Sequence, residues 1–353
     1  MSILKLVIIM VTVALVIMPT SAIKLQSMSL TSSSKLQNCT WLLPSDQGLQ
    51  LMDASPSVWQ ATITTLENVN IYCIIVWAGT WNTDHTINYA DSPTVWTQFI
   101  NTAKAVNPNF VVLALVNGGG IDISDSTYRT AMLNDVQQLM SSAPFDGVND
   151  DLETFTGTNQ NLIDYWQAEA SMVHGMGKIA TVDLGVDWSY KIEDVYPYLT
   201  NFDYIMPMFY WTIEDANALS YWNRILSSSP VPVIMGLDVD QDEMNNFSLS
   251  QQLSWIDQAI ASNPHSNLAG FSIWAYDYWG TSGGTSDDFA AWANWATKNP
   301  VPSPTPTPLE ATIITAAIIA IVAVVAALLF RKKAKKLTAE PKELVSIFDN
   351  ILP

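Results

Sequence analysis

The sequence predicts an α/β protein built as a (β/α)8 TIM barrel, followed by a single transmembrane helix. Three observations lead to this prediction. Eight short apolar segments alternate with longer amphipathic ones between residues 40 and 298. That span matches the ~250 residues typical of such a barrel. An uncharged apolar run then fills residues 311–330, which is long enough to cross a bilayer.

The first 22 residues have the features of a signal peptide. Lys5 precedes an apolar run over 6–18, and the small residues Thr20 and Ala22 suit cleavage after position 22. An uncleaved anchor is the alternative, but the run is shorter than the ~20 apolar residues that a spanning helix needs. We therefore expect a signal peptide over 1–22 and the barrel over 23–298.

The C-terminal part predicts a membrane anchor. The apolar run at 311–330 is followed directly by "RKKAKK", and basic residues gather on the cytoplasmic side of a membrane. We expect a transmembrane helix over 311–330 and a cytoplasmic tail over 331–353. The Pro/Ser/Thr-rich segment 299–310 is typical of an extended stalk. The sequence therefore predicts a single-pass type I protein of the cell membrane with an extracellular barrel.

Charge and cysteine content narrow the possible ligands. Residues 23–330 hold 30 acidic and eight basic side chains, a formal charge of −22. Such a charge repels nucleic acid and anionic membrane surfaces, and it suits a neutral or cationic ligand. Cys39 and Cys73 are the only cysteines, and a disulfide and two free buried thiols are both open. Three scattered histidines predict no metal site, and no motif indicates a cofactor.

The predicted strands are found by their apolar runs, and the helices by their caps and spacing. Ser92 followed by Pro93 marks the start of a helix over 92–106, and apolar residues at helical spacing indicate two more helices, at 124–140 and 248–262. No glycine-rich phosphate loop follows the first strands, which disfavours a doubly wound open sheet. The eight predicted strands are 39–43, 69–77, 109–117, 145–153, 178–185, 202–210, 231–238 and 268–276.

In a barrel of this type the chemistry lies at the C-terminal ends of the strands. These ends carry carboxylates, an amide and aromatic rings, a set suited to sugar hydroxyls and to the apolar faces of sugar rings. The alternative for each Trp is that it only plugs the top of the barrel. The residues at the predicted ends are Trp77, Asn117, Asp151, Glu153, Asp183, Tyr210, Trp211, Asp238, Trp274 and Tyr276.

Side-chain alternation divides the acidic segment 145–155 into two faces. If Glu153 points into the barrel mouth, Asp151 and Asn149 do so too, whereas Asp150 faces the helices. Neighbouring buried carboxylates do not all ionise readily, so we expect at least one raised pKa. Asp150 therefore needs a partner, such as a helix N-terminus or an arginine.

The segment "FDGVNDDLE" (145–153) resembles the fourth-strand signature DGxDxDxE of family 18 glycoside hydrolases, the chitinase and endo-β-N-acetylglucosaminidase group. Asp146, Gly147, Asp151 and Glu153 match this signature, and Asn149 replaces its first inner Asp. Only this motif is specific.

The resemblance continues along the predicted barrel in order. "LALVNGG" lies where the third strand usually reads Ser-x-Gly-Gly, with Val116 in place of Ser. "MPMFYW" is similar to the sixth-strand Met-x-Tyr-Asp segment: Met208 and Tyr210 match, and Trp211 replaces Asp. "GFSIW" is similar to the eighth strand and ends in Trp274.

The resemblance implies roles for four residues. Glu153 would protonate the glycosidic oxygen. Asp151 would orient the N-acetyl group of the substrate and stabilise its developing positive charge. Tyr210 would donate a hydrogen bond to the acetamido oxygen, and Trp274 would carry the distorted sugar. In this substrate-assisted scheme the acetamido oxygen is the nucleophile.

The leading hypothesis is a membrane-anchored extracellular glycoside hydrolase that cleaves β-linked N-acetylhexosamine glycans with retention. Two alternatives stay open: a barrel that binds glycans without cleaving them, and a hydrolase of other polysaccharides that pairs Glu153 with Asp183 or Asp238. The expected catalytic residues are Glu153, Asp151 and Tyr210, and the expected substrate-binding residues are Trp274, Asn149, Trp77, Met208, Asp183, Trp211 and Tyr276.

Overall fold

A computed structural model describes residues 38–42, 54–185, 190–208, 215–239, 248–262, 267–275 and 286–298. The chain divides into two units, Met1–Pro302 and Ser303–Pro353, and every described residue belongs to the first. The predicted signal peptide, stalk, transmembrane helix and tail therefore lie outside the described residues. Within the described ranges, no helix combines the length and the apolar character that a membrane crossing requires.

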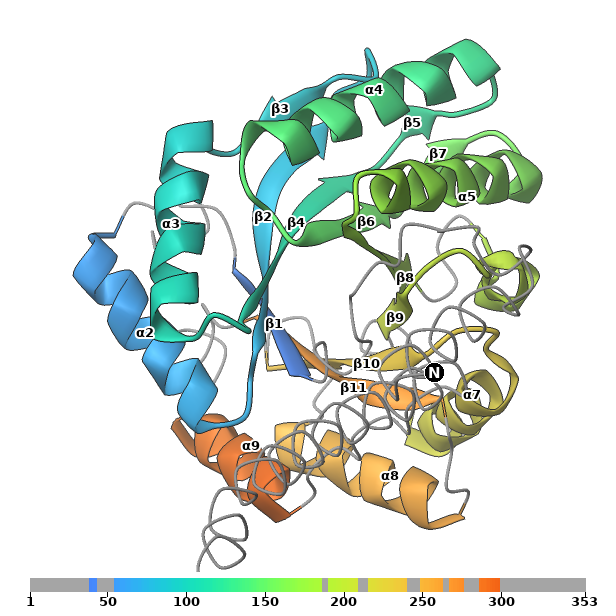
Figure 1. Ribbon diagram of the computed structural model, residues 1–353. Coiled ribbons are helices and arrows are strands. Elements are labelled where there is room, and N and C mark those ends of the chain that lie inside the picture. The colour runs from blue at the N-terminus through green and yellow to red at the C-terminus, as the bar shows by residue number, and fades with distance from the viewer. Residues whose placement is uncertain are drawn as a thin grey trace, which may run out of the picture. The chain divides into compact units, whose positions relative to one another are not determined.

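The described strands form a closed parallel barrel, which confirms the predicted fold of the main domain. The order is β1-β11-β10-β9-β8-β6-β4-β2, and β1 pairs with both β11 and β2 to close the ring. Figure 1 looks along the barrel, with the helices outside the strands. The eight strands are β1 (Asn38–Leu42), β2 (Cys73–Trp81), β4 (Val111–Gly118), β6 (Gly147–Leu152), β8 (Ile179–Gly185), β9 (Tyr204–Met208), β10 (Val233–Asp238) and β11 (Leu268–Trp274).

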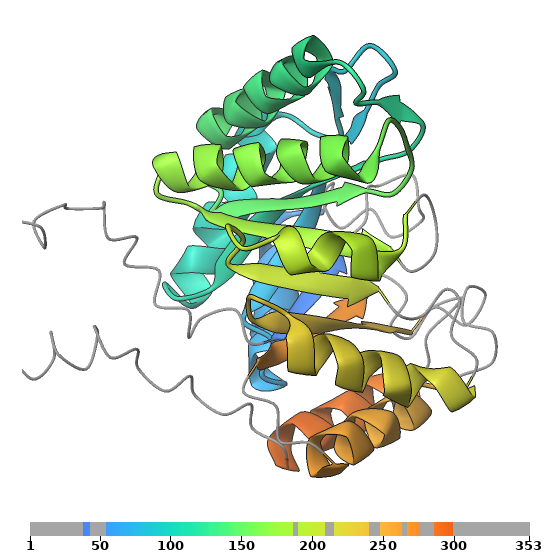
Figure 2. The ribbon, with the colours of Figure 1, turned by 90° about the vertical axis from the view of Figure 1, so that its right-hand side faces the viewer.

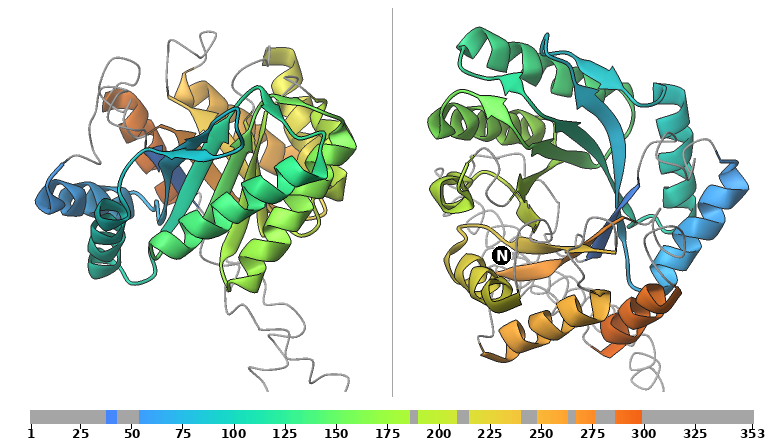
Figure 3. Two further views of the ribbon diagram at one scale, coloured as in Figure 1. Left: turned by 90° about the horizontal axis from the view of Figure 1, so that it is seen from above. Right: turned by 180° about the vertical axis from the view of Figure 1, so that it is seen from behind.

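A helix follows each strand of the ring, so the expected βα repeat is present throughout. Figures 2 and 3 show α4 and α5 side by side along the outer surface of the barrel. The helices are α2 (Pro56–Asn68), α3 (Pro93–Val106), α4 (Ser126–Ser142), α5 (Asn159–Gly175), the short α6 (Ile192–Val195), α7 (Asp215–Ser228), α8 (Leu249–Ser262) and α9 (Ser286–Lys298).

Local sequence explains where the helices begin. The Ser92 side chain accepts a hydrogen bond from Val95 N, with Pro93 in the first turn, so this predicted cap is confirmed. Thr158 forms a reciprocal capping box with Asn161 at the start of α5, the helix that covers β6.

Two apolar clusters hold the barrel together, one on each side of the strands. Outward side chains such as Val148 and Val182 pack against the helices, whereas inward ones such as Leu113 and Met206 fill the interior. This alternation is what a parallel barrel requires, because its strands are buried on both faces.

Strand β2 extends further than the sequence predicts. It continues past Trp77 to Trp81, its register with β4 shifts between Trp77 and Gly79, and its last residues pair with the antiparallel β3 (Ile87–Tyr89). Trp77 therefore lies at a bulge within the strand and not at its end, because the chain turns back as a hairpin before α3.

Cys39 and Cys73 are both free and fully buried, and they lie opposite each other in the registered pair β1–β2. Burial is the main cause that raises the pKa of Cys73. The structure therefore has the two buried thiols that were one of the two expectations.

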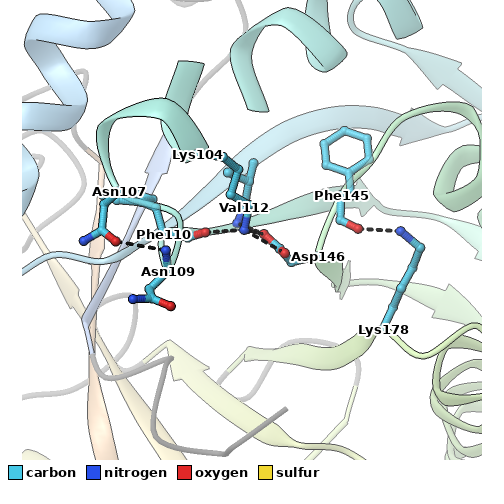
Figure 4. Close-up of polar contacts among 8 residues, drawn as sticks. All are labelled: Lys104, Asn107, Asn109, Phe110, Val112, Phe145, Asp146 and Lys178. Carbon is cyan, nitrogen blue, oxygen red and sulfur yellow. Dashed lines mark hydrogen bonds and ion pairs between the residues drawn. The ribbon is translucent and has the colours of Figure 1, made fainter. Parts of the chain in front are cut away.

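Asp146, the first residue of the signature, lies at the N-terminal end of β6, away from the barrel mouth. Its carboxylate accepts hydrogen bonds from Lys104 Nζ, at 2.8 and 2.7 Å, and from Val112 N at 2.8 Å. Figure 4 shows this contact and the neighbouring bond from Lys178 Nζ to the Phe145 carbonyl oxygen. Asp146 thus connects α3, β4 and β6 at the N-terminal end of the strands.

Gly147 follows because β6 and β8 approach each other closely here. A Cβ atom at this position would lie 2.1 Å from the Ile179 carbonyl oxygen, which no side chain could accommodate without moving the strands. The Asp-Gly pair that begins the signature is therefore a packing feature, and it ends four residues before Asp151.

Candidate active site

Asp151 and Glu153 meet at the C-terminal end of β6, where Asn117 of β4 lies between them. Asn117 Nδ2 donates to Asp151 Oδ2 at 2.7 Å and lies 3.5 Å from Glu153 Oε1. The registered pair Asn117↔Asp151 fixes this contact, because both side chains point to the interior. Glu153 follows the last residue of the strand and is half-buried, whereas Asp151 is only 4 % exposed. The predicted carboxylate pair is therefore present on one face of β6.

Asn149 lies one step deeper on the same inner face. Its Nδ2 donates to Thr181 Oγ1 at 3.0 Å and to Asp183 Oδ1 at 3.2 Å, both on β8. Asn149 is fully buried, so an aspartate here would add a third carboxyl to the buried pair Asp151 and Asp183. Asn149 therefore contributes a hydrogen bond to Asp183 at this position and adds no charge.

The inner carboxyl groups have raised pKa values, as expected for neighbouring buried acids. Burial raises the pKa of Asp151 to about 7; the Asn117 hydrogen bond opposes this, and the charge of Asp150 adds to it. Burial and the charge of Asp151 hold the pKa of Asp183 well above its usual range, against the hydrogen bond from Asn149. Asp151 is therefore poised to change its charge near neutral pH.

Two half-buried tryptophans pack on the apolar cluster inside the barrel. Trp274, at the end of β11, is half-buried and meets the fully buried Trp41 edge-on, with ring centroids 5.7 Å apart. Trp77 is also half-buried and packs on the same interior cluster, with its Nε1 donating to Thr80 Oγ1 at 3.1 Å. Both rings therefore lie over the interior cluster with part of their surface exposed.

The remaining predicted residues fall into two groups. Met208 is buried at the end of β9, and Asp238 is buried at the end of β10, where Gln252 of α8 bonds its backbone N–H and carbonyl oxygen. Tyr210, Trp211 and Tyr276 lie outside the described residues.

Asp150 has the partners that a buried carboxylate needs, but they are neither a helix N-terminus nor an arginine, the two examples that the sequence suggested. Its carboxylate accepts from Trp166 Nε1 at 2.7 Å and from Tyr165 OH at 3.0 Å, both in the body of α5. The tyrosine and tryptophan have polar groups that reach inward from an apolar helix face, and the sequence pattern showed only their apolar character.

Sequence reasoning also missed two interior residues that contact Asn149. Thr181 accepts its amide, and Met206 places its sulfur 3.7 Å from the same nitrogen. Each lies two residues before a predicted site residue, Asp183 or Met208, so strand alternation would have placed both on the inner face. Within the described residues no group of three or more His, Cys, Asp or Glu side chains is arranged to hold a metal.

This arrangement can handle protons beside an aromatic surface. Glu153 is the carboxyl nearest to solvent, and Asp151 behind it titrates near neutrality. Asp151 Oδ1 is buried and has no hydrogen-bond partner among the described residues. A bound molecule with an N–H group would therefore find an unused acceptor next to a carboxyl that can donate a proton.

No protein-family model matches the chain, and no curated protein sequence matches it. Solved structures do match its fold. A xylanase–α-amylase inhibitor protein, XAIP-I, solved with trehalose, superposes with a TM-score of 0.55 at 16 % identity, covering 73 % of this chain and 98 % of the inhibitor. The barrel therefore shares its fold with this inhibitor protein.

Two chitinase structures also superpose on the barrel. The group IV chitinase of Ostrinia furnacalis superposes with a TM-score of 0.53 at 14 % identity, over 74 % of this chain and 99 % of the enzyme. The family 18 chitinase ChiB of Flavobacterium johnsoniae gives 0.50 at 15 % identity, over 73 % and 94 %. The barrel has the fold of family 18 chitinases. This fold occurs in chitinases and in an inhibitor protein, so the residues of the site must decide the activity.

Proposed function

We propose that this protein is a glycoside hydrolase that cleaves β-linked N-acetylhexosamine glycans, chitin or a related polymer, by substrate-assisted catalysis with retention. The observation that carries the proposal is the pair Asp151 and Glu153 on one inner face of β6, linked through Asn117. Half-buried Trp274 supplies an aromatic surface for a sugar ring.

The reaction needs one acid that donates a proton and one group that handles positive charge. Glu153, the more exposed carboxyl, gives its proton to the glycosidic oxygen as the C1–O bond breaks. The acetamido oxygen of the same sugar attacks C1 and forms a cyclic ion. Asp151 accepts the acetamido N–H through Oδ1 and stabilises the positive charge on the ring. Water, losing its proton to Glu153, then attacks C1 and restores the acetamide.

Tyr210 would donate to the acetamido oxygen, as the resemblance implies. The chain's negative charge agrees with a neutral glycan. A pairing of Glu153 with Asp183 is less favoured, because Asp183 is 2 % exposed and bound to Asn149 below the mouth.

The experiment compares the wild type with Glu153→Gln on N-acetylchitotetraose. We expect hydrolysis to fall by at least about a thousandfold, because no acid protonates the leaving oxygen. Binding measured by calorimetry should change by less than about threefold. Asp257→Asn, on the exposed face of α8, is the matched control and should keep both properties. Unchanged hydrolysis in Glu153→Gln would overturn the assignment.

A second candidate is a barrel that binds glycans without cleaving them. Asn149 favours it, because this position contributes an amide and not a carboxyl to the inner row. The inhibitor protein XAIP-I, which was solved with the sugar trehalose, has the same fold. Calorimetric binding of N-acetylchitotetraose by the wild type, with no product after long incubation, would select this candidate.

The location of the protein is also a proposal. The signal segment 1–22, the stalk 299–310, the apolar segment 311–330 and the basic tail 331–353 favour a single-pass protein with the barrel outside the cell. Protease added to intact cells should then remove the barrel and leave a membrane-bound fragment that contains the tail.

A further inference from the structure

Asp150 is a fully buried carboxylate on the outer face of β6, between the barrel and α5. It binds three donors: Trp166 Nε1 at 2.7 Å and Leu152 N at 3.2 Å on Oδ1, and Tyr165 OH at 3.0 Å on Oδ2. Substrate at the inner face would not touch it. Burying a carboxylate is costly, so a residue kept at this position should serve the strand that carries it.

The position of Asp150 coincides with the point where β6 separates from β8. The registered pairing with β8 runs from Gly147↔Ile179 to Asp150↔Val182 and stops there. The pairing with β4 continues to Gly118↔Leu152. Beyond Asp150, β6 therefore has a strand neighbour on one side only. Asp151 and Glu153 therefore follow the point where the pairing with β8 ends.

A side-chain bond replaces the lost ladder at this point. Leu152 lies between Asp151 and Glu153, and its backbone N–H is held by Asp150 Oδ1. On the other side, Glu153 N donates to the Gly118 carbonyl oxygen of β4 at 2.9 Å. The strand end is thus fixed by β4 on one side, and by Asp150 with α5 on the other.

Glu169 of α5 completes the cluster. It is fully buried, and its carboxyl lies against Asp150 and Tyr165. Among the described residues neither of its oxygens accepts a conventional hydrogen bond, and no salt bridge reaches either acid. Burial and the charge of Asp150 hold the pKa of Glu169 well above its usual range. Burial and the neighbouring Asp150 charge therefore both favour the neutral form of Glu169 in this cluster.

We propose that Asp150 is a positioning residue, which anchors the free end of β6 to α5 and so fixes Asp151 and Glu153 relative to Asn117. The catalytic part of this inference rests on the proposed function, whereas the anchoring part does not. The ionisable groups facing Asp150 are Tyr165 and Glu169 of α5, Asp151 on its own strand, Asp183 of β8, and Tyr190.

Two substitutions of Asp150 distinguish the effect of its hydrogen bonds from the effect of its charge. Asp150→Leu fills a similar volume but accepts no hydrogen bond, so the Leu152 N–H and α5 lose their anchor. Asp150→Asn keeps an oxygen for the Leu152 and Trp166 N–H groups and removes the charge. Its amide nitrogen takes the place of Oδ2 and can donate to the Tyr165 hydroxyl oxygen. Val148→Ala is the matched control, because it changes the same outer face two residues earlier and leaves the Asp150 bonds intact.

The first readout is hydrogen exchange of backbone amides in full-length protein, followed by mass spectrometry over residues 151–156. We expect Asp150→Leu to speed exchange there by at least tenfold, and Asp150→Asn and Val148→Ala to stay within about threefold of the wild type. Wild-type exchange in Asp150→Leu would overturn the inference. If that variant does not fold, the double variant Tyr165→Phe/Trp166→Phe takes its place, because it removes both bonds from α5 to Asp150. Wild-type protection in the double variant would overturn the anchoring to α5.

The second readout is hydrolysis of N-acetylchitotetraose as a function of pH. Asp150→Leu should lower kcat at least tenfold with KM changed less than threefold. Asp150→Asn should keep kcat within threefold and move the acid limb to lower pH, because the charge of Asp150 raises the pKa of Asp151. Val148→Ala should change neither value. An unshifted profile in Asp150→Asn together with unchanged kcat in Asp150→Leu would contradict a positioning role.

The two proposals fail in different ways. A wild-type protein that cleaves no chito-oligosaccharide overturns the proposed function, and hydrogen exchange alone then decides the anchoring. A wild-type protein that cleaves them, with unchanged exchange and kcat in Asp150→Leu, overturns the anchoring and leaves the proposed function standing.

Discussion

The Asn117 side chain contacts both Asp151 and Glu153 and so connects the two carboxyl groups. Its amide donates to Asp151 Oδ2 at 2.7 Å and lies within 3.5 Å of Glu153. That hydrogen bond lowers the pKa of Asp151 against the stronger effect of burial. The amide thus favours the ionised form of a carboxyl that the interior would otherwise keep neutral.

Replacing Asn117 by Ala should therefore raise the pKa of Asp151 above about 7. We expect kcat to fall by roughly tenfold to a hundredfold, because the charge that stabilises the cyclic ion is lost. The acid limb of the pH profile should move to higher pH, which steady-state kinetics between pH 4 and 9 would detect.

Asn107→Ala is the control for this prediction. Asn107 also donates its amide to a carboxylate, Glu67 Oε1 at 2.6 Å, but it caps the end of α3 that leads into β4, at the opposite end of the barrel. Its pH profile should match the wild type. An equal shift in both variants would show that the effect does not pass through Asp151.

At the scale of elements, β6 has two ends with different tasks. Asp146 and Gly147 hold the N-terminal end of the strand in place, and Asp151 and Glu153 lie at its C-terminal end. Under the proposed function the signature combines packing and chemistry within eight residues, and the two parts should respond differently to mutation.

Asp146→Ala should destabilise the fold without changing the site. It removes the acceptor for Val112 N and for Lys104 Nζ, and we expect a loss of about 1–3 kcal/mol in the free energy of unfolding. Urea unfolding followed by tryptophan fluorescence measures this loss. The kcat of the folded fraction should stay within about threefold of the wild type; a large drop in kcat at full stability would place Asp146 in the chemistry instead.

The elements differ in how well the sequence predicts them. The apolar runs predicted the strands, and the Ser92 cap predicted the start of α3, because both signals are local in the sequence. The extension of β2 to Trp81 escaped prediction, because it depends on pairing with β3. The inward pair on β6 followed from alternation alone, whereas the partners of Asp150 did not, since they require knowing which face of α5 meets β6.

For the molecule as a whole, buried acids set the pH dependence of stability. The pKa values of Asp150 and Asp151 are raised to about 6 and about 7, and those of Asp183 and Glu169 are held well above their usual range, in every case mainly by burial. The unfolded chain releases these protons near pH 4. Between pH 4 and 7 the folded protein binds more protons, so its stability falls as pH rises through this window.

We therefore expect the free energy of unfolding to be larger at pH 5 than at pH 8, by on the order of 2–5 kcal/mol. Urea unfolding at both pH values measures the difference. Glu169→Gln should flatten the dependence, because one of the proton-binding groups is removed. Greater stability at pH 8 than at pH 5 would mean that these carboxyl groups are ionised in the folded protein.

The sequence predicted the closed barrel correctly because strand and helix segments alternate eight times along the chain. Eight strand–helix units led to a closed barrel because only closure pairs every strand. Closure through β1 brings Trp41 against Trp274, a contact between residues 233 positions apart that no local pattern contains. Tyr210, Trp211 and Tyr276 stay predictions, as do the signal peptide and the membrane anchor, because they lie outside the described residues.

The most direct test is to offer the wild-type protein two oligomers with the same β-1,4 linkage, N-acetylchitopentaose and cellopentaose. They differ at C2, where the first carries the acetamido group and the second a hydroxyl. If the acetamido oxygen is the nucleophile, only N-acetylchitopentaose is cleaved, and proton NMR shows β-anomeric products first. Cleavage of both oligomers at similar rates, or α-anomeric first products, would contradict substrate-assisted catalysis at Asp151 and Glu153.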